Sequence, residues 1–169
     1  LNPCEHPVIC DRIACATYLI AGAVTGGDVV LENTNPVHLN AIIPPLEEAG
    51  CQINIRCKEI RLKAPSRLKR IDKIITQPYP GFPTDAQAPF TTLVCVARGT
   101  SVIVENIFES RYKHIGELLR FGAKIHVEGR MAVVEGVHRL NGANVRATDL
   151  RGGSAMILAG LQARGTTEI

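Results

Sequence analysis

Two aspartates in this sequence are placed so that their carboxylates could do chemistry. In the segment Phe82–Gln87, Asp85 stands where a proline-restricted, extended stretch turns into a helix. Its carboxylate could cap the helix by accepting backbone N–H bonds. It could equally face a cleft and act as a general base, or as an acceptor for a substrate hydroxyl. The sequence leaves both roles open.

The second aspartate, Asp149, is followed by Arg151 and then by the small residues Gly152–Ser154. A helix N-terminus with a nearby guanidinium favours anions, because its unpaired N–H groups point outward and small residues leave room for approach. Asp11 occupies the corresponding place near the start of the chain. Because the aspartate recurs, we predict a capping role at all three positions, with a functional role added at Asp85 and Asp149.

A third segment, Glu105–Tyr112, leaves a predicted strand and enters a helix, and such loops are common places for ligand contacts. Within it, Arg111 could hold an anionic group, or it could be solvated or paired with Glu109. The five histidines show neither metal-ligand spacing nor a triad partner, and the six cysteines contain no C-x-x-C pair. We therefore predict no metal site.

The elements that position these segments recur along the chain as an internal repeat. In each half an aspartate is followed by an apolar helix, a glycine turn and an apolar strand that ends in Glu-Asn, at residues 29–33 and 103–106. Later in each half, a helix ends at a glycine suited to a left-handed C-cap, Gly50 or Gly122, and a strand follows. The first helices of the three copies are predicted at Tyr18–Val24, Phe90–Ala97 and Ala155–Gln162.

Each complete copy closes with a hairpin, the second of which turns near Glu128–Arg130. The sequence therefore predicts an α/β fold of β-α-β-α-β-β units over about residues 5–64, 74–136 and 143–169. The third unit stops before its second helix and hairpin, so we expect residues 1–169 to form a single incomplete domain. The stretch Cys51–Cys57 alternates apolar and polar residues, which predicts a strand with both cysteines on its buried face.

The composition excludes several classes of protein. With 46% hydrophobic and 21% charged residues, the chain is an ordinary globular protein. Its apolar stretches are far shorter than the roughly 18 residues of a membrane span, and its first residues lack the features of a secretory signal. We expect a cytoplasmic protein with no membrane partner. The basic run from Arg61 to Lys73 lacks interleaved aromatics, so a solvated loop is favoured over a nucleic-acid site.

Three ordered motifs, Gly81–Gln87, Glu105–Arg111 and Ala147–Arg151, resemble those of the UDP-N-acetylglucosamine 1-carboxyvinyltransferases, a family of enolpyruvyl transferases. The resemblance extends along nearly the whole chain. Members of this family have two similar domains, each built from three β-α-β-α-β-β units as an inside-out barrel with helices within and sheets outside. The resemblance implies that this chain is most of one domain and that its partner is a second domain of the same polypeptide.

These enzymes transfer the enolpyruvyl group of phosphoenolpyruvate to the 3′-hydroxyl of UDP-N-acetylglucosamine, by addition and then elimination of phosphate. The reaction is the first committed step of peptidoglycan synthesis, and so serves cell wall biogenesis, cell shape and cell division. It requires no metal or organic cofactor. By resemblance, Asp85 and Asp149 are catalytic carboxylates and Asp85 contacts the attacking sugar hydroxyl. Ile107 corresponds to a backbone contact with the nucleotide sugar, and Arg111 and Arg151 correspond to basic, substrate-binding residues on the anionic side of the cleft.

The sequence also departs from the family. Ala86, Pro89 and Ser110 stand where bulkier or more polar residues are expected. The family's Lys-Asn motif and its reactive cysteine loop have no counterpart in this chain, so we predict that the chain alone has no turnover. Two other functions stay open: a domain like that of 5-enolpyruvylshikimate-3-phosphate synthase, which uses the same donor, and a non-catalytic repeat module that binds a partner protein.

Overall fold

The computed structural model describes residues 3–169, so Leu1 and Asn2, at the start of the segment tested for a secretory signal, lie outside the described residues. The helices are α1 (Arg12–Val24), α2 (Ile43–Glu48), α3 (Gln87–Cys95), α4 (Ile115–Arg120) and α5 (Leu150–Gln162), with short 3-10 turns η1 (Pro36–Leu39) and η2 (Thr84–Ala86). The strands are β1 (Asp28–Leu31), β2 (Gln52–Arg56), β3 (Glu59–Lys63), β4 (Lys73–Ile75), β5 (Thr100–Val104), β6 (Lys124–Glu128) and β7 (Met131–Glu135). None of these helices combines the length and apolarity needed to cross a membrane.

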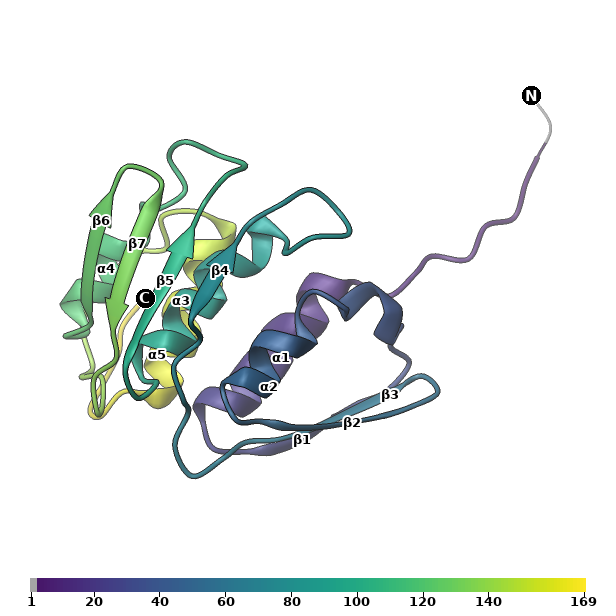
Figure 1. Cartoon of the computed structure of the whole chain (residues 1–169), viewed down its shortest axis with the longest axis horizontal. Coiled ribbons are helices and arrows are strands. Elements are labelled where there is room, and N and C mark those ends of the chain that lie inside the picture. Colours follow the sequence, from purple (N-terminus) through teal and green to yellow (C-terminus); the bar gives the residue numbers. More distant parts are fainter. Residues whose placement is uncertain (1–2) are drawn as a thin grey trace.

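The strands form two open sheets (Figure 1). The first is antiparallel, in the order β1-β3-β2, and the second runs β4-β5-β7-β6 with β4 parallel to β5. Alternate residues of the central strands, such as Ile60 and Leu62 in β3 and Ala132 and Val134 in β7, are fully buried because one face of each sheet packs against helices. The α/β class is therefore confirmed. Neither sheet closes on itself, so the inside-out barrel stays a prediction.

Three helices, α1, α3 and α5, pack against one another at the centre, and the sheets flank them (Figure 1). Every residue of α3 is buried, including the polar Gln87, Thr91 and Thr92. A helix that is covered on all sides has to lie inside the molecule. Three of the predicted site residues, Asp85, Asp149 and Arg151, lie at or next to the N-terminal ends of this central helix and its neighbour α5.

The second predicted unit has the expected element order, β4, α3, β5, α4, β6 and β7, whereas the first lacks its opening strand. Residues 3–11 run to α1 without regular structure and are largely exposed, and Figure 1 shows them leading away from the body of the molecule. Pro7 has no N–H to donate to a strand ladder, which disfavours a strand in this segment. The glycines predicted to end the second helices are confirmed: Gly50 and Gly122 have φ of 93° and 84°.

Several boundaries differ from the sequence prediction. The helices α1, α3 and α5 start six, three and five residues earlier than predicted, because polar residues in their first turns obscure the apolar pattern. The prediction that Cys57 is buried is wrong. The strand β2 ends at Arg56, and Cys57 lies exposed in the following turn with φ of 50°, while Cys51 is buried as expected.

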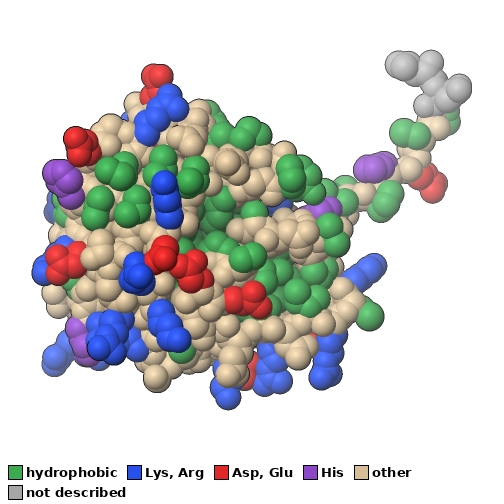
Figure 2. All heavy atoms as spheres, viewed as in Figure 1, with side chains coloured by type: hydrophobic (Ala, Val, Ile, Leu, Met, Phe, Trp, Pro, Cys, Tyr) green, Lys and Arg blue, Asp and Glu red, His purple; other side chains and the backbone are tan. Residues whose placement is uncertain are grey.

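The predicted basic loop is also only partly a loop, since its first residues, Arg61 and Lys63, belong to β3. Arg61 donates two hydrogen bonds of 2.8 Å to Asp28 on the neighbouring strand. Figure 2 shows acidic and basic side chains interspersed over the visible face. Within the basic run, Arg61 and Arg70 therefore form local pairs, with Asp28 and Asp72, on a solvated surface.

Gly136, just after β7, packs so closely against the turn that follows α3 that there is no room for a side chain. A Cβ there would lie 1.6 Å from the carbonyl oxygen of Ala97, and the Gly136 N–H donates to Gly99 at 2.9 Å. We expect Gly136→Ala to lower the free energy of unfolding by at least about 2 kcal/mol. Gly116→Ala in α4, where a Cβ meets open space, should instead raise it by about 0.5 kcal/mol. Urea denaturation of both variants checks this, and equal effects would contradict it.

Candidate functional site

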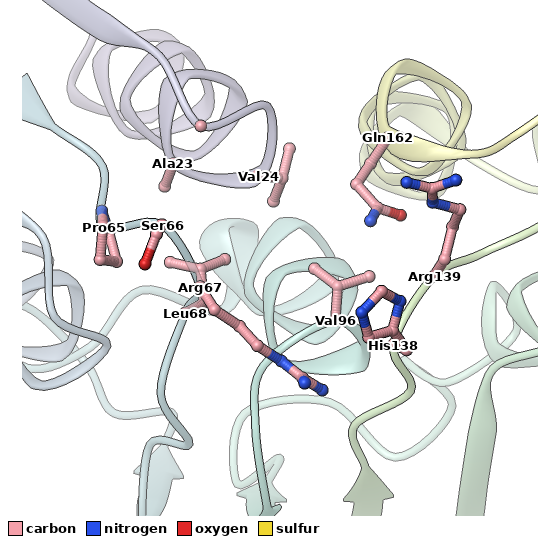
Figure 3. Close-up of a pocket in the computed structure, with 11 residues that line it drawn as sticks. Ala23, Val24, Pro65, Ser66, Arg67, Leu68, Val96, His138, Arg139 and Gln162 are labelled. Atoms are coloured by element: carbon pink, nitrogen blue, oxygen red, sulfur yellow. The ribbon is translucent and has the colours of Figure 1, made fainter.

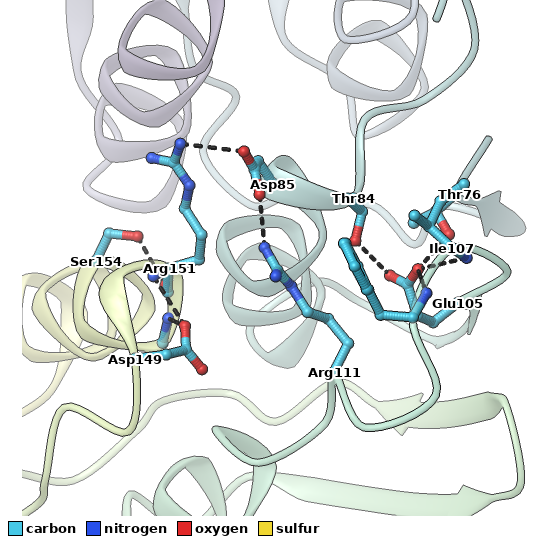
Figure 4. Close-up of polar contacts among 11 residues, drawn as sticks. Thr76, Thr84, Asp85, Glu105, Ile107, Arg111, Asp149, Arg151 and Ser154 are labelled. Atoms are coloured by element: carbon cyan, nitrogen blue, oxygen red, sulfur yellow. Dashed lines mark hydrogen bonds and ion pairs between the residues drawn. The ribbon is translucent and has the colours of Figure 1, made fainter. Parts of the chain in front are cut away.

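The N-terminal ends of α3 and α5 and the loop after β5 meet at one end of the central helices (Figure 4). Asp85 lies in η2, immediately before α3. Asp149 and Arg151 lie at the start of α5, and Arg111 comes from the loop that leads into α4. The fold thus brings together side chains that are up to 66 positions apart in the sequence.

Asp85 is held between two arginines. Arg111 donates from Nη2 to Oδ1 of Asp85 at 2.5 Å, and Arg151 donates from Nη2 to Oδ2 at 3.2 Å. The Asp85 side chain is 40% exposed, whereas those of Arg111 and Arg151 are 23% and 25% exposed. The pair of guanidinium groups covers one side of the carboxylate and leaves another side open to an incoming group.

The expectation that Asp85 caps a helix is wrong. The residue before η2 is Pro83, and no side chain caps this turn or the helix that follows it. Asp85 lies inside the turn, so its carboxylate is turned away from the first N–H groups of α3 and towards the arginines. The alternative pairing of Arg111 with Glu109 is wrong as well, because Glu109 lies 3.5 Å from Arg130.

The capping role is confirmed for the other two aspartates. Oδ1 of Asp149 accepts the N–H groups of Arg151 and Gly152 at 2.9 and 2.8 Å, and Asp11 caps α1 in the same way. The N–H of Gly152, supported by that of Arg151 and by the nearby Arg111 and His114, holds the pKa of Asp149 below its usual value. Asp149 is therefore an anion that anchors the turn from which Arg151 extends.

A buried carboxylate, Glu105, organises the other side of the site. Its Oε1 accepts hydrogen bonds from Oγ1 of Thr76 at 2.8 Å and from the N–H groups of Ile107 and Phe108 at 2.8 and 3.1 Å. Its Oε2 accepts from Oγ1 of Thr84 at 2.9 Å, and the residue is completely buried. Glu105 thus fixes the loop that contains Ile107 to the turn that precedes α3.

Sequence reasoning missed this role of Glu105. The repeat does not reveal it either, because the matching residue Glu32 in the first unit is exposed in the structure and Glu105 is buried. The available signal was the pair of threonines, Thr76 and Thr84, whose hydroxyls could serve a carboxylate, but both are distant in sequence. Only the fold shows that they converge.

A cavity of about 630 Å³ opens beside these residues. It is lined by Ile107, Phe108, Glu109, Ser110, Arg111, Lys113, Arg130, Thr148 and Asp149. Three of the predicted site residues, Ile107, Arg111 and Asp149, therefore line the same cavity. Arg111 also contacts Asp85, which in turn contacts Arg151. A smaller cavity, of about 220 Å³, lies between the C-terminal ends of α1 and α5, and none of the predicted site residues lines it. Figure 3 shows the residues that do.

His114 is buried directly behind the site and is 1% exposed. Its Nε2 has no hydrogen-bond partner among residues 3–169. Burial lowers the pKa of His114 from 6.5 to about 4, and the neighbouring Asp149 and a backbone hydrogen bond with Arg111 offset only part of this effect. The ring is therefore neutral where it packs behind the two arginine-bearing segments.

This pKa predicts how stability depends on pH. Because the folded pKa is depressed, the unfolded chain binds a proton at His114 more readily than the folded chain below pH 6.5. The contribution of the neutral His114 to the free energy of unfolding is complete above that pH. We expect the free energy of unfolding to fall by roughly 3 kcal/mol as the pH falls to about 4. His114→Gln should remove this loss, whereas His126→Gln on the exposed strand β6 should keep it. Urea unfolding of the three proteins from about pH 7 to 4 measures it, and equal slopes for wild type and His114→Gln would contradict the prediction.

The fold is that of enolpyruvyl transferases. The crystal structure of the enolpyruvyl transferase NikO from Streptomyces tendae superposes with a TM-score of 0.83 and 25% identity, over 95% of this chain and 38% of that one. EPSP synthase from Acinetobacter baumannii matches the fold with a TM-score of 0.68 and 18% identity, over 96% of this chain and 39% of that one. Residues 1–169 match the family model of EPSP synthase (3-phosphoshikimate 1-carboxyvinyltransferase), and the chain belongs to this family.

Sequence relatives point to one branch of the family. The UDP-N-acetylglucosamine 1-carboxyvinyltransferase of Geobacter metallireducens is 53% identical over the whole of this chain and 40% of its own length. The protein of the same name from Desulfofundulus thermocisternus is 55% identical over 98% of this chain and 68% of its own length. The chain spans about 40% of the length of most of these relatives.

Proposed function

We propose that this chain is part of an enzyme that transfers the enolpyruvyl group of phosphoenolpyruvate to the 3′-hydroxyl of UDP-N-acetylglucosamine, in the first committed step of peptidoglycan synthesis. The observation that carries the proposal is the partly exposed Asp85 held between Arg111 and Arg151. The names of relatives with 49–55% identity support the choice of acceptor. The relationship to EPSP synthase structures at 18–19% identity extends to the fold alone.

In this proposal Asp85 accepts the proton of the attacking hydroxyl as a general base, because one side of its carboxylate is open. Arg111 and Arg151 each contact Asp85 through one Nη2, so each guanidinium keeps further N–H donors for the phosphate and carboxylate of the donor. A doubly anionic donor would draw the two guanidinium groups towards itself and leave Asp85 free for the sugar. Charge stabilisation by the same arginines then assists the loss of phosphate.

Two further residues have supporting roles in this proposal. The N–H of Ile107 is already bonded to Glu105, so a backbone contact with the nucleotide sugar would use its carbonyl oxygen. Asp149 lines the cavity and fixes the turn that carries Arg151, and its negative charge balances the arginines. The remaining catalytic groups would come from a second domain of the complete polypeptide.

We also propose that the complete domain is an inside-out barrel. The mutual packing of α1, α3 and α5 supports this arrangement. So does the outer side of α5, where Ile157 and Leu161 are 56% and 58% exposed and where a sheet of the third unit would lie. The described cysteines are all free thiols, which is consistent with a cytoplasmic location.

Phosphate release tests the proposed function. The full-length gene product should release phosphate when both phosphoenolpyruvate and UDP-N-acetylglucosamine are present, and not when either is omitted. Residues 1–169 alone should release none, because they provide only part of the site. Release with shikimate 3-phosphate in place of the nucleotide sugar would overturn the choice of acceptor, and turnover by residues 1–169 alone would overturn the need for a second domain.

A further inference from the structure

Two cysteines, Cys10 and Cys15, flank the start of α1 in a geometry that brings their side chains together. Asp11 caps the helix by accepting the N–H groups of Ile13 and Ala14. Cys10 is then the residue before the cap and Cys15 is the fourth residue of the helix. Side chains at these two positions pack against each other in many helices, as a hydrophobic staple. In this chain the two staple positions are both occupied by thiols, one on each side of the Asp11 cap.

The two thiols have different surroundings. Sγ of Cys10 accepts the backbone N–H of Asn35 at 3.1 Å, which holds this sulfur beside the start of η1. Burial raises the pKa of the Cys15 thiol, and the neighbouring Cys10 and Asp11 raise it further, so Cys15 keeps its proton. Both side chains are partly accessible, unlike the buried Cys51 and Cys95. Cys10 is therefore placed to react first and Cys15 to resolve the product.

We propose that Cys10 and Cys15 form a redox site that closes reversibly into a disulfide by exchange with a low-molecular-weight disulfide. The Cys10 thiolate attacks one sulfur of that disulfide, whose S–S bond breaks and releases one small thiolate. Cys15, after losing its proton, attacks Sγ of Cys10 and releases the second small thiolate. The two protons from the cysteines end on the two small thiols, so the protein is oxidised by two electrons and the small disulfide is reduced.

The disulfide would act on the segment that enters α1. It would fix residues 3–10 to the first turn of the helix and remove Cys10 from the N–H of Asn35. The next residue but one, Arg12, stacks over the ring of Tyr79 at 4.8 Å, and α1 packs against η2, which carries Asp85. The site thus adjoins the candidate functional site, but it does not depend on the proposed transferase activity.

Glutathione disulfide is the probe for this proposal. After incubation of the folded chain, the intact mass should fall by two hydrogen atoms, and peptide mapping should find Cys10 linked to Cys15. Alkylation of both by N-ethylmaleimide should become at least about tenfold slower, while alkylation of the exposed Cys57 should stay unchanged. Dithiothreitol should restore the original rates.

Variants separate this site from general thiol reactivity. In Cys15→Ser, glutathione should remain on Cys10 as a mixed disulfide, because no second thiol displaces it. Cys57→Ser, which alters an exposed cysteine elsewhere, should still close. Circular dichroism should show all variants folded, since serine replaces a partly exposed side chain. A persistent mixed disulfide on Cys10 of the wild type, or its cross-link to Cys4 or Cys57, would overturn the proposal.

Discussion

Replacing Asp85 by alanine in the full-length gene product is expected to lower kcat by about a hundredfold or more, as for the loss of a general base. The carboxylate is the acceptor of two guanidinium groups, and its exposed side is where a hydroxyl could approach. Without it, Arg111 and Arg151 keep their charges and can still bind the anionic donor. We therefore expect the KM for phosphoenolpyruvate to change much less than kcat, and steady-state phosphate release measures both.

The matched control is Asp28→Ala. Asp28 also pairs with an arginine, Arg61, but this pair lies on the exposed side of the first sheet. Solvent screens an exposed ion pair of this kind, so its loss should leave kcat within about twofold. If Asp85→Ala turned over as fast as Asp28→Ala, the enzyme hypothesis would fail for this residue, and a non-catalytic repeat module would gain support.

Several features of the fold can be predicted from the sequence because neighbouring residues determine them. Gly50 and Gly122 were identified as C-caps from the residues beside them, and both have positive φ. Asp11 and Asp149 were identified as caps in the same way, since capping needs only the N–H groups two and three residues ahead. Signals of this kind operate within a few residues, so a single sequence contains them.

The role of Asp85 could not be predicted from the same local pattern. Its sequence context resembles that of Asp149, yet its hydrogen-bond partners are Arg111 and Arg151, which are 26 and 66 residues away. Two charged donors brought in by the fold compete successfully with backbone N–H groups, because charge-assisted hydrogen bonds are about twice as strong as neutral ones. The family resemblance proposed the functional role, but the geometry that supports it is tertiary.

Glu105→Ala is expected to lower the free energy of unfolding by about 3 kcal/mol or more. The substitution removes the acceptor of the Thr76 hydroxyl in a buried place, and the acceptor of three partly buried donors, the Thr84 hydroxyl and the N–H groups of Ile107 and Phe108. An unsatisfied buried donor costs about 1–3 kcal/mol, although four such losses do not simply add. Urea denaturation of the chain measures the change.

The same substitution should reduce kcat/KM of the full-length gene product, because Glu105 holds the loop before Arg111 and the turn that carries Asp85. Glu105→Gln separates geometry from charge. Its amide oxygen can replace Oε1, which accepts three of the four hydrogen bonds, and its NH2 group can donate to Thr84. We therefore expect Glu105→Gln to recover most of the stability and activity lost in Glu105→Ala.

Glu109→Ala, in the same loop but 88% exposed, should change the free energy of unfolding by no more than about 0.5 kcal/mol. If Glu105→Gln were as defective as Glu105→Ala, the negative charge rather than the hydrogen-bond geometry would be what this position supplies.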